Sequence, residues 1–308
     1  MLPFDLPPGL TKQAALGARW ADWLAGLPRT VAGLLEEWEL TYDGDPMHGW
    51  CSLVLPVRTT GGRPAALKVA LPDDENEHEH LALQHWHGNG AVLLLRADPR
   101  RYALLLERLH REDLTDLWEL EACEIVAGLY QRIHVPALPR LRTLTSYVDR
   151  WNAGLAALPK DAPVPRRLVE QAVALAGSFL TDEASRGVMI HGDLHYENVL
   201  AADREPWLVI DPKPVSGDPH YEVAPLLWNR WQETVASGRV REAVRRRFHT
   251  VVDTAGLDEE RARDWVVVRA MYNACWTVDD ARALGRAVTR EDREWITTMV
   301  TLAKAVQG

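Results

Sequence analysis

A dense set of acids, histidines and an amide stands between two apolar runs in residues 188–200, VMIHGDLHYENVL. Asp193 and Asn198 lie five residues apart there, and Asp211 follows Asp193 by eighteen residues, at the end of the apolar run PWLVID. Burying so many polar groups is costly, so we expect them to form a site. Mg²⁺ prefers hard oxygen ligands such as the Asn198 amide and the Asp211 carboxylate. Asp193 can accept a proton from a hydroxyl.

This spacing is the one that protein kinases use for phosphoryl transfer. There, the Asp of an H-x-D motif receives the proton of the substrate hydroxyl, an Asn five residues later binds magnesium, and a strand-end Asp binds it too. His191 is expected to brace the loop, and Asp218 to cap and tie the segment that follows. The alternative is a polar turn with capping acids, which explains one Asp or one Asn but not the whole spacing.

A lysine in an apolar strand provides an independent test. Lys68 is the only charge in AALKVAL, where an unpaired ammonium would be expensive to bury. Kinases use such a lysine to bind the phosphates and pair it with an acid on the next helix. Glu79, eleven residues later, is the expected partner, with Glu75 and Glu77 as alternatives.

Two further segments are predicted to bind a nucleotide. Residues 42–57 form a turn between two strands that contains Gly49 and could fold over a nucleotide. The turn matches neither G-x-G-x-x-G nor a Walker loop, so a plain hairpin turn is the alternative. Residues 104–110, LLLERLH, are predicted to be the linker whose backbone contacts the adenine, with Glu107 and Leu109 among them.

Composition limits the possible partners. The 308 residues are 47% hydrophobic and 26% charged, as in an ordinary folded protein. No long apolar run or signal peptide is evident, which predicts a cytoplasmic protein. The net charge of −9 argues against nucleic acid or an anionic membrane as partner and is compatible with a cationic small molecule. Three widely spaced cysteines suggest neither disulfides nor a zinc site.

The elements that must position these residues change character once along the chain. Up to residue 109, short Val- and Leu-rich runs predict strands, around one helix at 73–88. These strand predictions are 37–43, 50–57, 64–71, 91–97 and 101–107. After residue 110 the apolar spacing is helical, at 117–134, 166–184, 224–237 and 261–278, with a hairpin at 198–211. The prediction is an α+β protein with a nucleotide-binding N-lobe, 1–109, and a helical C-lobe, 110–308, that carries the catalytic loop, the metal site and the acceptor pocket.

The residues assembled above resemble a known family. Residues 191–227, HGDLHYENVLAADREPWLVIDPKPVSGDPHYEVAPLL, are similar to the aminoglycoside/hydroxyurea antibiotic-resistance kinases, and weaker likeness extends over nearly the whole chain. The resemblance implies a bilobal fold like that of eukaryotic protein kinases and ATP-dependent phosphorylation of a small-molecule hydroxyl. It assigns catalysis to Asp193, Mg²⁺ to Asn198 and Asp211, and phosphate binding to Lys68.

The resemblance implies an aminoglycoside acceptor, most readily one like streptomycin, and acids in the helical half would suit its positive charges. Glu222, Asp279 and Asp280 are expected to line the acceptor side, because carboxylates pair with and steer cations. Trp276 would form an apolar wall. The alternatives are that Glu222 serves the helix it opens, and that the paired acids merely cap the end of a helix.

Two other functions remain open. The first is a housekeeping kinase of an amino sugar, cyclitol or other small metabolite. The second is a non-catalytic kinase-like binding module, which we would expect to have lost Lys68, Asp193 or Asp211, whereas all three are present. If Lys213 contacts the acceptor, a cationic acceptor is disfavoured.

Overall fold

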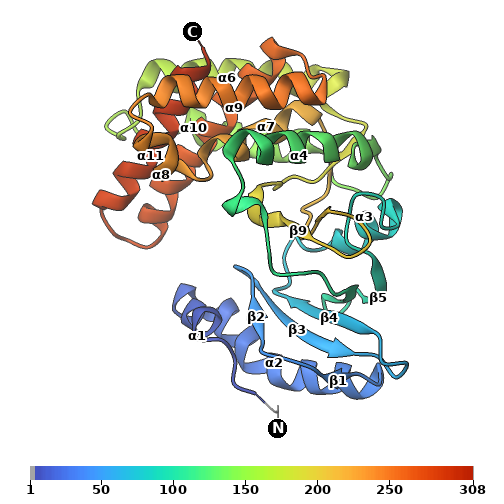
Figure 1. Ribbon diagram of the computed structural model, residues 1–308. Helices are drawn as coiled ribbons and strands as arrows, with labels where there is room; N and C mark the ends of the chain where they lie inside the picture. The colour runs from blue at the N-terminus through green and yellow to red at the C-terminus, as the bar shows by residue number, and fades with distance from the viewer. Residues whose placement is uncertain (1–3, 308) are drawn as a thin grey trace. The chain divides into compact units, whose positions relative to one another are not determined.

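The computed structural model describes residues 4–307 and divides into two compact units (Figure 1). The first contains the chain up to Arg111 together with Ala201–Lys213, and the second contains the rest. The predicted C-lobe, 110–308, included residues 201–213, and this boundary is wrong. Backbone hydrogen bonds explain the difference, because Val209 pairs with Gly90 and Val92 at 3.0 and 2.9 Å. Asp211 therefore belongs to the same unit as Lys68.

The first unit is built on a six-stranded sheet in the order β1-β3-β4-β6-β5, with β2 also paired to β3. Its strands are β1 (Thr41–Tyr42), β2 (Met47–His48), β3 (Ser52–Arg58), β4 (Pro64–Ala70), β5 (Leu94–Asp98) and β6 (Ala103–Glu107). Its helices are α1 (Pro8–Thr11), η1 (Lys12–Leu16), α2 (Ala18–Glu37) and α3 (Glu79–Trp86), and β10 (Trp207–Val209) completes the unit. All pairings along the six-stranded sheet are antiparallel.

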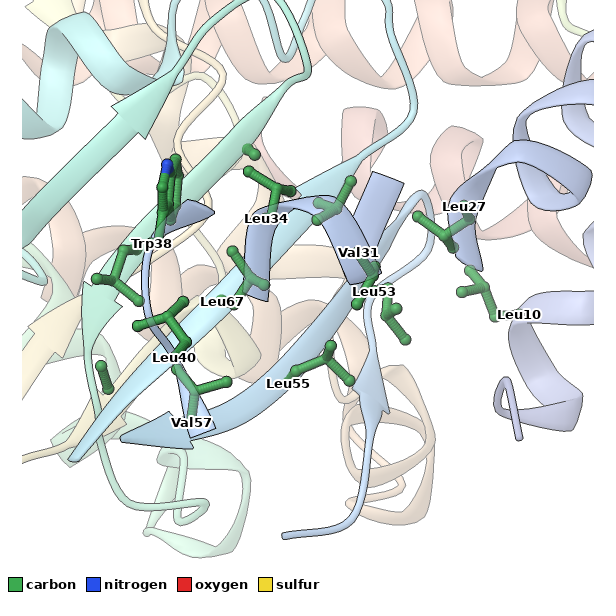
Figure 2. Close-up of a cluster of buried hydrophobic side chains, with 14 of the residues drawn as sticks. Leu10, Leu27, Val31, Leu34, Trp38, Leu40, Leu53, Leu55, Val57 and Leu67 are labelled. Atoms are coloured by element: carbon green, nitrogen blue, oxygen red, sulfur yellow. The ribbon is translucent and has the colours of Figure 1, made fainter. Parts of the chain in front are cut away.

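The core of this unit lies between α2 and the sheet (Figure 2). Helix α2 was not predicted, although Leu27, Val31 and Leu34 recur at intervals of three and four residues, which places them on one buried face. They belong to one buried cluster with residues of β3 and β4, including Leu67 and Val69. Side chains alternate along a strand, so Lys68 lies on the other face of the sheet.

Helix α3 is shorter than predicted, since it begins at Glu79 and not near residue 73. The Asp73 carboxylate accepts hydrogen bonds from the backbone N–H groups of Glu75 and Asn76, at 3.0 and 2.9 Å. Such side-chain bonds favour a turn over a helix. The turn leaves Glu79 in the first turn of α3, where it faces Lys68.

The second unit is mostly helical, as predicted, with a small sheet in the order β11-β8-β7. Its helices are η2 (Leu114–Asp116), α4 (Glu119–Ile133), α5 (Leu144–Ala156), α6 (Arg166–Thr181), η3 (Glu183–Ser185), η4 (Tyr196–Asn198), η5 (Pro219–Glu222), α7 (Val223–Trp228), α8 (Trp231–Ala236), α9 (Val240–Ala255), α10 (Glu259–Ala283) and α11 (Arg290–Val306). Its strands are β7 (Val135–Pro136), β8 (Val188–Ile190) and β11 (Val215–Gly217), and β9 (Val199–Ala201) spans the boundary, because Ala201 belongs to the first unit. Strand β9 pairs with β10, which confirms the predicted hairpin.

One predicted helix is interrupted. The helix expected over 224–237 is broken between α7 and α8, where Arg230 has a left-handed backbone with φ of 56°. The Arg230 guanidinium donates to the carbonyl of Leu117 at 2.7 Å, and this tertiary contact holds the break. Within residues 4–307, no helix is long and apolar enough to cross a membrane.

Candidate active site

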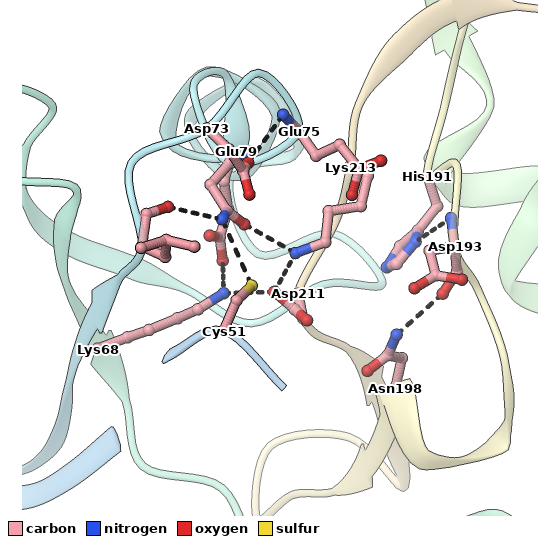
Figure 3. A network of polar contacts seen from close by, with 12 residues as sticks. Cys51, Lys68, Asp73, Glu75, Glu79, His191, Asp193, Asn198, Asp211 and Lys213 are labelled. Atoms are coloured by element: carbon pink, nitrogen blue, oxygen red, sulfur yellow. Dashed lines mark hydrogen bonds and ion pairs between the residues drawn. The ribbon is translucent and has the colours of Figure 1, made fainter. Parts of the chain in front are cut away.

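Lys68 and Glu79 form a buried ion pair in the first unit (Figure 3). Strand β4 lies between β3 and β6, so Lys68 is only 5% exposed. Its Nζ is 2.6 Å from Glu79 Oε1 and 2.5 Å from Asp211 Oδ1. The partner is therefore Glu79, as expected, and not Glu75 or Glu77. Each charge of the ion pair neutralises the other, and either one would be costly to bury alone.

Asp211 receives a second lysine. Lys213 Nζ lies 2.9 Å from Asp211 Oδ1 and 2.8 Å from Asn76 Oδ1. Both lysines bind the same carboxylate oxygen, and no residue in the described chain donates a hydrogen bond to Oδ2. Asp211 has a left-handed backbone with φ of 55°, which is unfavourable for a residue with a side chain and is frequent at functional sites. The cluster thus holds Asp211 with one oxygen free.

Charge compensation keeps Asp211 ionised. Burial by itself would raise the pKa of Asp211, but the nearby charges of Lys68 and Lys213 hold it well below its ordinary value. Burial would likewise lower the pKa of Lys213, and the attraction of Asp211 and then Glu79 raises it instead. Asp211 is therefore an anionic oxygen donor at neutral pH.

In the second unit, Asp193 lies in the loop between β8 and η4. Its side chain makes no hydrogen bond or ion pair with any residue between 4 and 307, although it is only partly exposed. Gly192, just before it, has φ of 86°, a conformation that favours glycine. The Asp193 backbone N–H donates to His191 Nδ1 at 3.3 Å, so His191 braces the loop as predicted. Asp193 has a fixed backbone and a free carboxylate.

Asn198 closes the same loop. Its side-chain amide donates to the carbonyl of Asp193 at 2.8 Å, across the five-residue spacing seen in the sequence (Figure 3). This bond orients the amide group of Asn198. The amide oxygen Oδ1 accepts no hydrogen bond from another described residue. Asn198 is 7% exposed, so its orientation is well defined.

Glu222 is a buried clamp on the Asp193 loop. Its Oε1 accepts a hydrogen bond from the Gly192 N–H at 2.6 Å, and its Oε2 accepts from the His191 N–H at 3.1 Å and from His134 at 2.9 Å. The residue is 0% exposed. The prediction that Glu222 lines an acceptor site is wrong, because the carboxylate is completely enclosed and fully used by the loop. Burial would raise the pKa of Glu222, but the hydrogen bond from His134 helps to hold it below its ordinary value.

Arg269 of α10 holds the same loop from another direction. Its guanidinium donates to the carbonyls of Gly192 and Tyr221, at 3.2 and 2.9 Å, and lies 3.9 Å from the centre of the Tyr221 ring. Neither Arg269 nor His134 was predicted as a site residue. A signal for Arg269 was available, because it is the only charge in the apolar run VVVRAMY and resembles Lys68 in that respect.

Asp218 ties the segment after β11 to the helices. It is 1% exposed and accepts hydrogen bonds from Trp265 Nε1 and Arg261 Nε, both at 2.6 Å. It also accepts a bond from the His220 N–H at 3.1 Å, which caps η5. The predicted role as a capping and tying residue is confirmed.

The predicted nucleotide turn and linker lie in the first unit. Gly49 follows β2, and its N–H donates to the Ser52 carbonyl at 3.0 Å. Glu107 ends β6, and its carboxylate binds Arg204 at 2.8 Å and the Leu93 N–H at 2.7 Å. Its side chain is thus occupied within the protein. Leu109 follows two residues later, outside any helix or strand.

Comparison with known proteins identifies the family. Residues 37–281 match the model of the aminoglycoside/hydroxyurea antibiotic resistance kinases. The chain belongs to this family. It is 39% identical to a streptomycin 6-kinase of Streptomyces glaucescens, over 96% of this chain and 94% of that one. It is 38% identical to a hydroxyurea phosphotransferase of Kitasatospora aureofaciens, over 94% of this chain and 83% of that one.

Solved structures support the kinase-like fold. A ternary complex of aminoglycoside phosphotransferase APH(4)-Ia with ADP and hygromycin B matches 90% of this chain and 98% of its own, with a TM-score of 0.57 and 18% identity. The choline kinase LicA of Streptococcus pneumoniae matches 90% and 99%, with a TM-score of 0.58 and 14% identity. At these identities the likeness is one of fold. The α+β, protein-kinase-like fold predicted from the sequence is confirmed.

In this family member, the remaining candidate residues lie near the end of α10. The Trp276 ring packs against the rings of Trp151 and Tyr272, with centroids 5.1 and 6.2 Å apart, and is partly exposed. The Asp279 side chain is 45% exposed and lies 3.7 Å from Arg282, while Asp280 is exposed. Helical geometry places Asp279 about 15 Å along the axis from Arg269. Asp279 also accepts a hydrogen bond from the Cys275 thiol at 3.5 Å.

Each unit offers one oxygen donor of the type that Mg²⁺ prefers. Among residues 4–307 there is no cluster of three or more acids, histidines or cysteines that could hold a metal unaided. Mg²⁺ at kinase-type sites needs only one or two protein oxygens, because phosphate and water supply the rest. Asp211 Oδ2 and Asn198 Oδ1 are each unused by the described protein and are of the required type.

Proposed function

We propose that this protein transfers the terminal phosphoryl group of ATP directly, in line, to a hydroxyl of a small molecule, most readily a streptomycin-like aminoglycoside. One observation carries the proposal. Asp193 has a free carboxylate on a loop whose backbone is fixed by Glu222 and Arg269. A base for an acceptor hydroxyl needs this combination, because catalysis depends on accurate positioning and on an available lone pair.

The other residues divide the work of binding the nucleotide. Lys68, held by Glu79, would bind phosphate oxygens. Asp211 and Asn198 would hold Mg²⁺, which neutralises the charge that develops on the phosphates. The turn with Gly49 and the linker with Glu107 and Leu109 would contact the nucleotide mainly through the backbone, which suits the internal use of the Glu107 side chain. ATP as donor fits the cytoplasmic location expected from the sequence.

The acceptor is proposed from charge and from the relatives' names. Asp279 and Asp280 would attract a cationic sugar and Trp276 would form an apolar wall beside it. Hydroxyurea is a second candidate acceptor, because the chain is about equally identical to a streptomycin 6-kinase and to a hydroxyurea phosphotransferase, at 39% and 38%. Hydroxyurea is neutral and small, so its binding would need neither Asp279 nor Asp280.

A coupled assay of ADP release distinguishes these acceptors. The purified protein is incubated with ATP and Mg²⁺ and with streptomycin, hydroxyurea, choline or a neutral amino-free sugar in parallel, and the phosphorylated position is read by NMR. We expect phosphorylation of streptomycin. Turnover of a neutral sugar alone would overturn the proposed acceptor class and favour the housekeeping kinase. No turnover with any acceptor, together with no binding of ATP, would overturn the phosphotransferase proposal itself.

A further inference from the structure

Lys213 is the feature of the first unit that the kinase pattern does not account for. It stands two residues after Asp211 in the run IDPKP, and its side chain turns back onto that acid (Figure 3). It is 14% exposed, so it is not an ordinary surface lysine. Its bond to Asn76 Oδ1, from the turn before α3, fixes the side chain from a second side.

Lys68 and Lys213 bond to the same oxygen of Asp211, at 2.5 and 2.9 Å, and Glu79 provides Lys68 with a second carboxylate. The two ammonium groups can therefore be no farther apart than the sum of these distances. At this separation one anion with several oxygens could contact both ammonium groups at once.

Each ammonium group also has hydrogen-bonding capacity left. A lysine ammonium has three donors. Lys68 uses two of them, on Glu79 and Asp211, and Lys213 uses two, on Asp211 and Asn76. One N–H on each lysine therefore lacks an acceptor among the described residues. Two neighbouring cations, each with one unused donor, match an anion that presents several oxygens.

We propose that Lys213 is a second phosphate-binding lysine, which contacts the polyphosphate of the nucleotide together with Lys68. The proposal rests on the proposed function, because it assumes that Lys68 faces phosphate. In kinases the magnesium ions bridge oxygens of the last two phosphates, and Lys213 contacts Asp211, the proposed magnesium ligand. Lys213 should therefore contribute more to binding ATP than to binding ADP. Its ion pair with Asp211 offsets part of the positive charge that a cationic acceptor would meet.

Calorimetric titration of Lys213→Met tests this directly. ATP with Mg²⁺, ADP with Mg²⁺, and adenosine are titrated into the wild type, Lys213→Met, Lys213→Arg and the control Lys12→Met. Lys12 is an exposed lysine of the same unit. We expect Lys213→Met to weaken ATP about 10- to 100-fold, the range for a lost hydrogen bond to a charged group. ADP should weaken less and adenosine should bind as before. Lys213→Arg should retain most of the ATP affinity, and Lys12→Met all of it.

The other outcomes separate the two proposals. ATP binding by Lys213→Met that equals the wild type would overturn the role of Lys213 and leave the phosphotransferase proposal standing. Equal losses for ATP, ADP and adenosine, with a lowered melting temperature, would assign Lys213 a purely structural role and also overturn the inference. If the wild type binds no nucleotide, both proposals fail. Circular dichroism of each variant shows whether a loss reflects unfolding, and Lys213→Arg provides the folded comparison if Lys213→Met is unstable.

Discussion

In the first unit, charged side chains of the site hold one another, whereas in the second unit the site side chain is free and its backbone is held. Lys68, Asp211 and Lys213 are joined by ion pairs of 2.5 to 2.9 Å. Asp193 has no side-chain partner in the described chain, yet Glu222 and Arg269 fix the loop that carries it. The difference is that permanent charges need compensation when buried, while a group that accepts a proton must keep a lone pair available.

Loss of the Asp193 carboxylate should have the largest effect on catalysis. Asp193→Asn keeps the shape but removes the base, so we expect kcat to fall by ~10²–10⁴. Nucleotide affinity should stay within a few-fold, because the residue acts on the acceptor. Steady-state kinetics and ATP titration measure the two quantities. Turnover within a few-fold of the wild type would show that Asp193 is not the base.

Loss of the clamp should affect stability and catalysis together. Glu222→Ala leaves two loop N–H groups and His134 without their acceptor in a buried site, and we expect ~3 kcal/mol lower free energy of unfolding, with a lower kcat. Urea denaturation measures the first. Glu260→Ala is the control, because Glu260 is exposed on α10. Equal stability of Glu222→Ala and the control would contradict the clamp.

Removal of Lys68 tests the phosphate-binding role proposed for the paired charges of the first unit. Lys68→Met should weaken ATP by ~10- to 100-fold, since it removes one charge-assisted bond to phosphate. The acceptor KM should change little, because the Asp193 loop is held by other residues. Fluorescence or calorimetric titration of ATP gives the affinity. A larger effect on the acceptor than on ATP would contradict this assignment.

Low pH should destabilise the second unit by protonating Glu222. Because the pKa of Glu222 lies below its ordinary value of 4.5, its contribution to stability is complete above that pH and is lost as the pH falls toward the folded pKa. The stability difference between wild type and Glu222→Gln should therefore narrow as the pH falls below 4.5. Urea midpoints measured from pH 7 to pH 3 check this. A difference that is constant with pH would mean that Glu222 is not charged in the folded protein.

The smallest effect is expected at the acceptor side. Asp279→Asn with Asp280→Asn should raise the KM for streptomycin ~3- to 10-fold, because exposed charges contribute only modestly. The ATP KM should stay unchanged, and added salt should weaken the variant less than the wild type. Asp253→Asn, an exposed acid of α9, is the control. If a cationic acceptor is phosphorylated and its KM is the same for the double variant and the control, Asp279 and Asp280 do not belong to the acceptor site.

Much of this site could be predicted from local pattern. The lone Lys68 in an apolar strand, the spacing of Asp193 and Asn198, and the strand-end Asp211 are readable because each rests on a short-range rule of burial or motif spacing. The same rule applied to VVVRAMY would also have found Arg269. Helix α2 could have been found from its buried face, which recurs at helical intervals.

Local pattern is enough to predict the candidate residues for chemistry, the strands of the first part and the helices of the second, and the cap formed by Asp218. It could not show that Glu222 is a buried clamp, that Asp211 belongs with the first unit, or that Lys213 turns onto Asp211. The reason is distance along the chain. Lys68 and Asp211 are 143 residues apart and Asn76 and Lys213 are 137 apart, so no local propensity relates them, and their contacts form only when the sheet and the returning hairpin pack together.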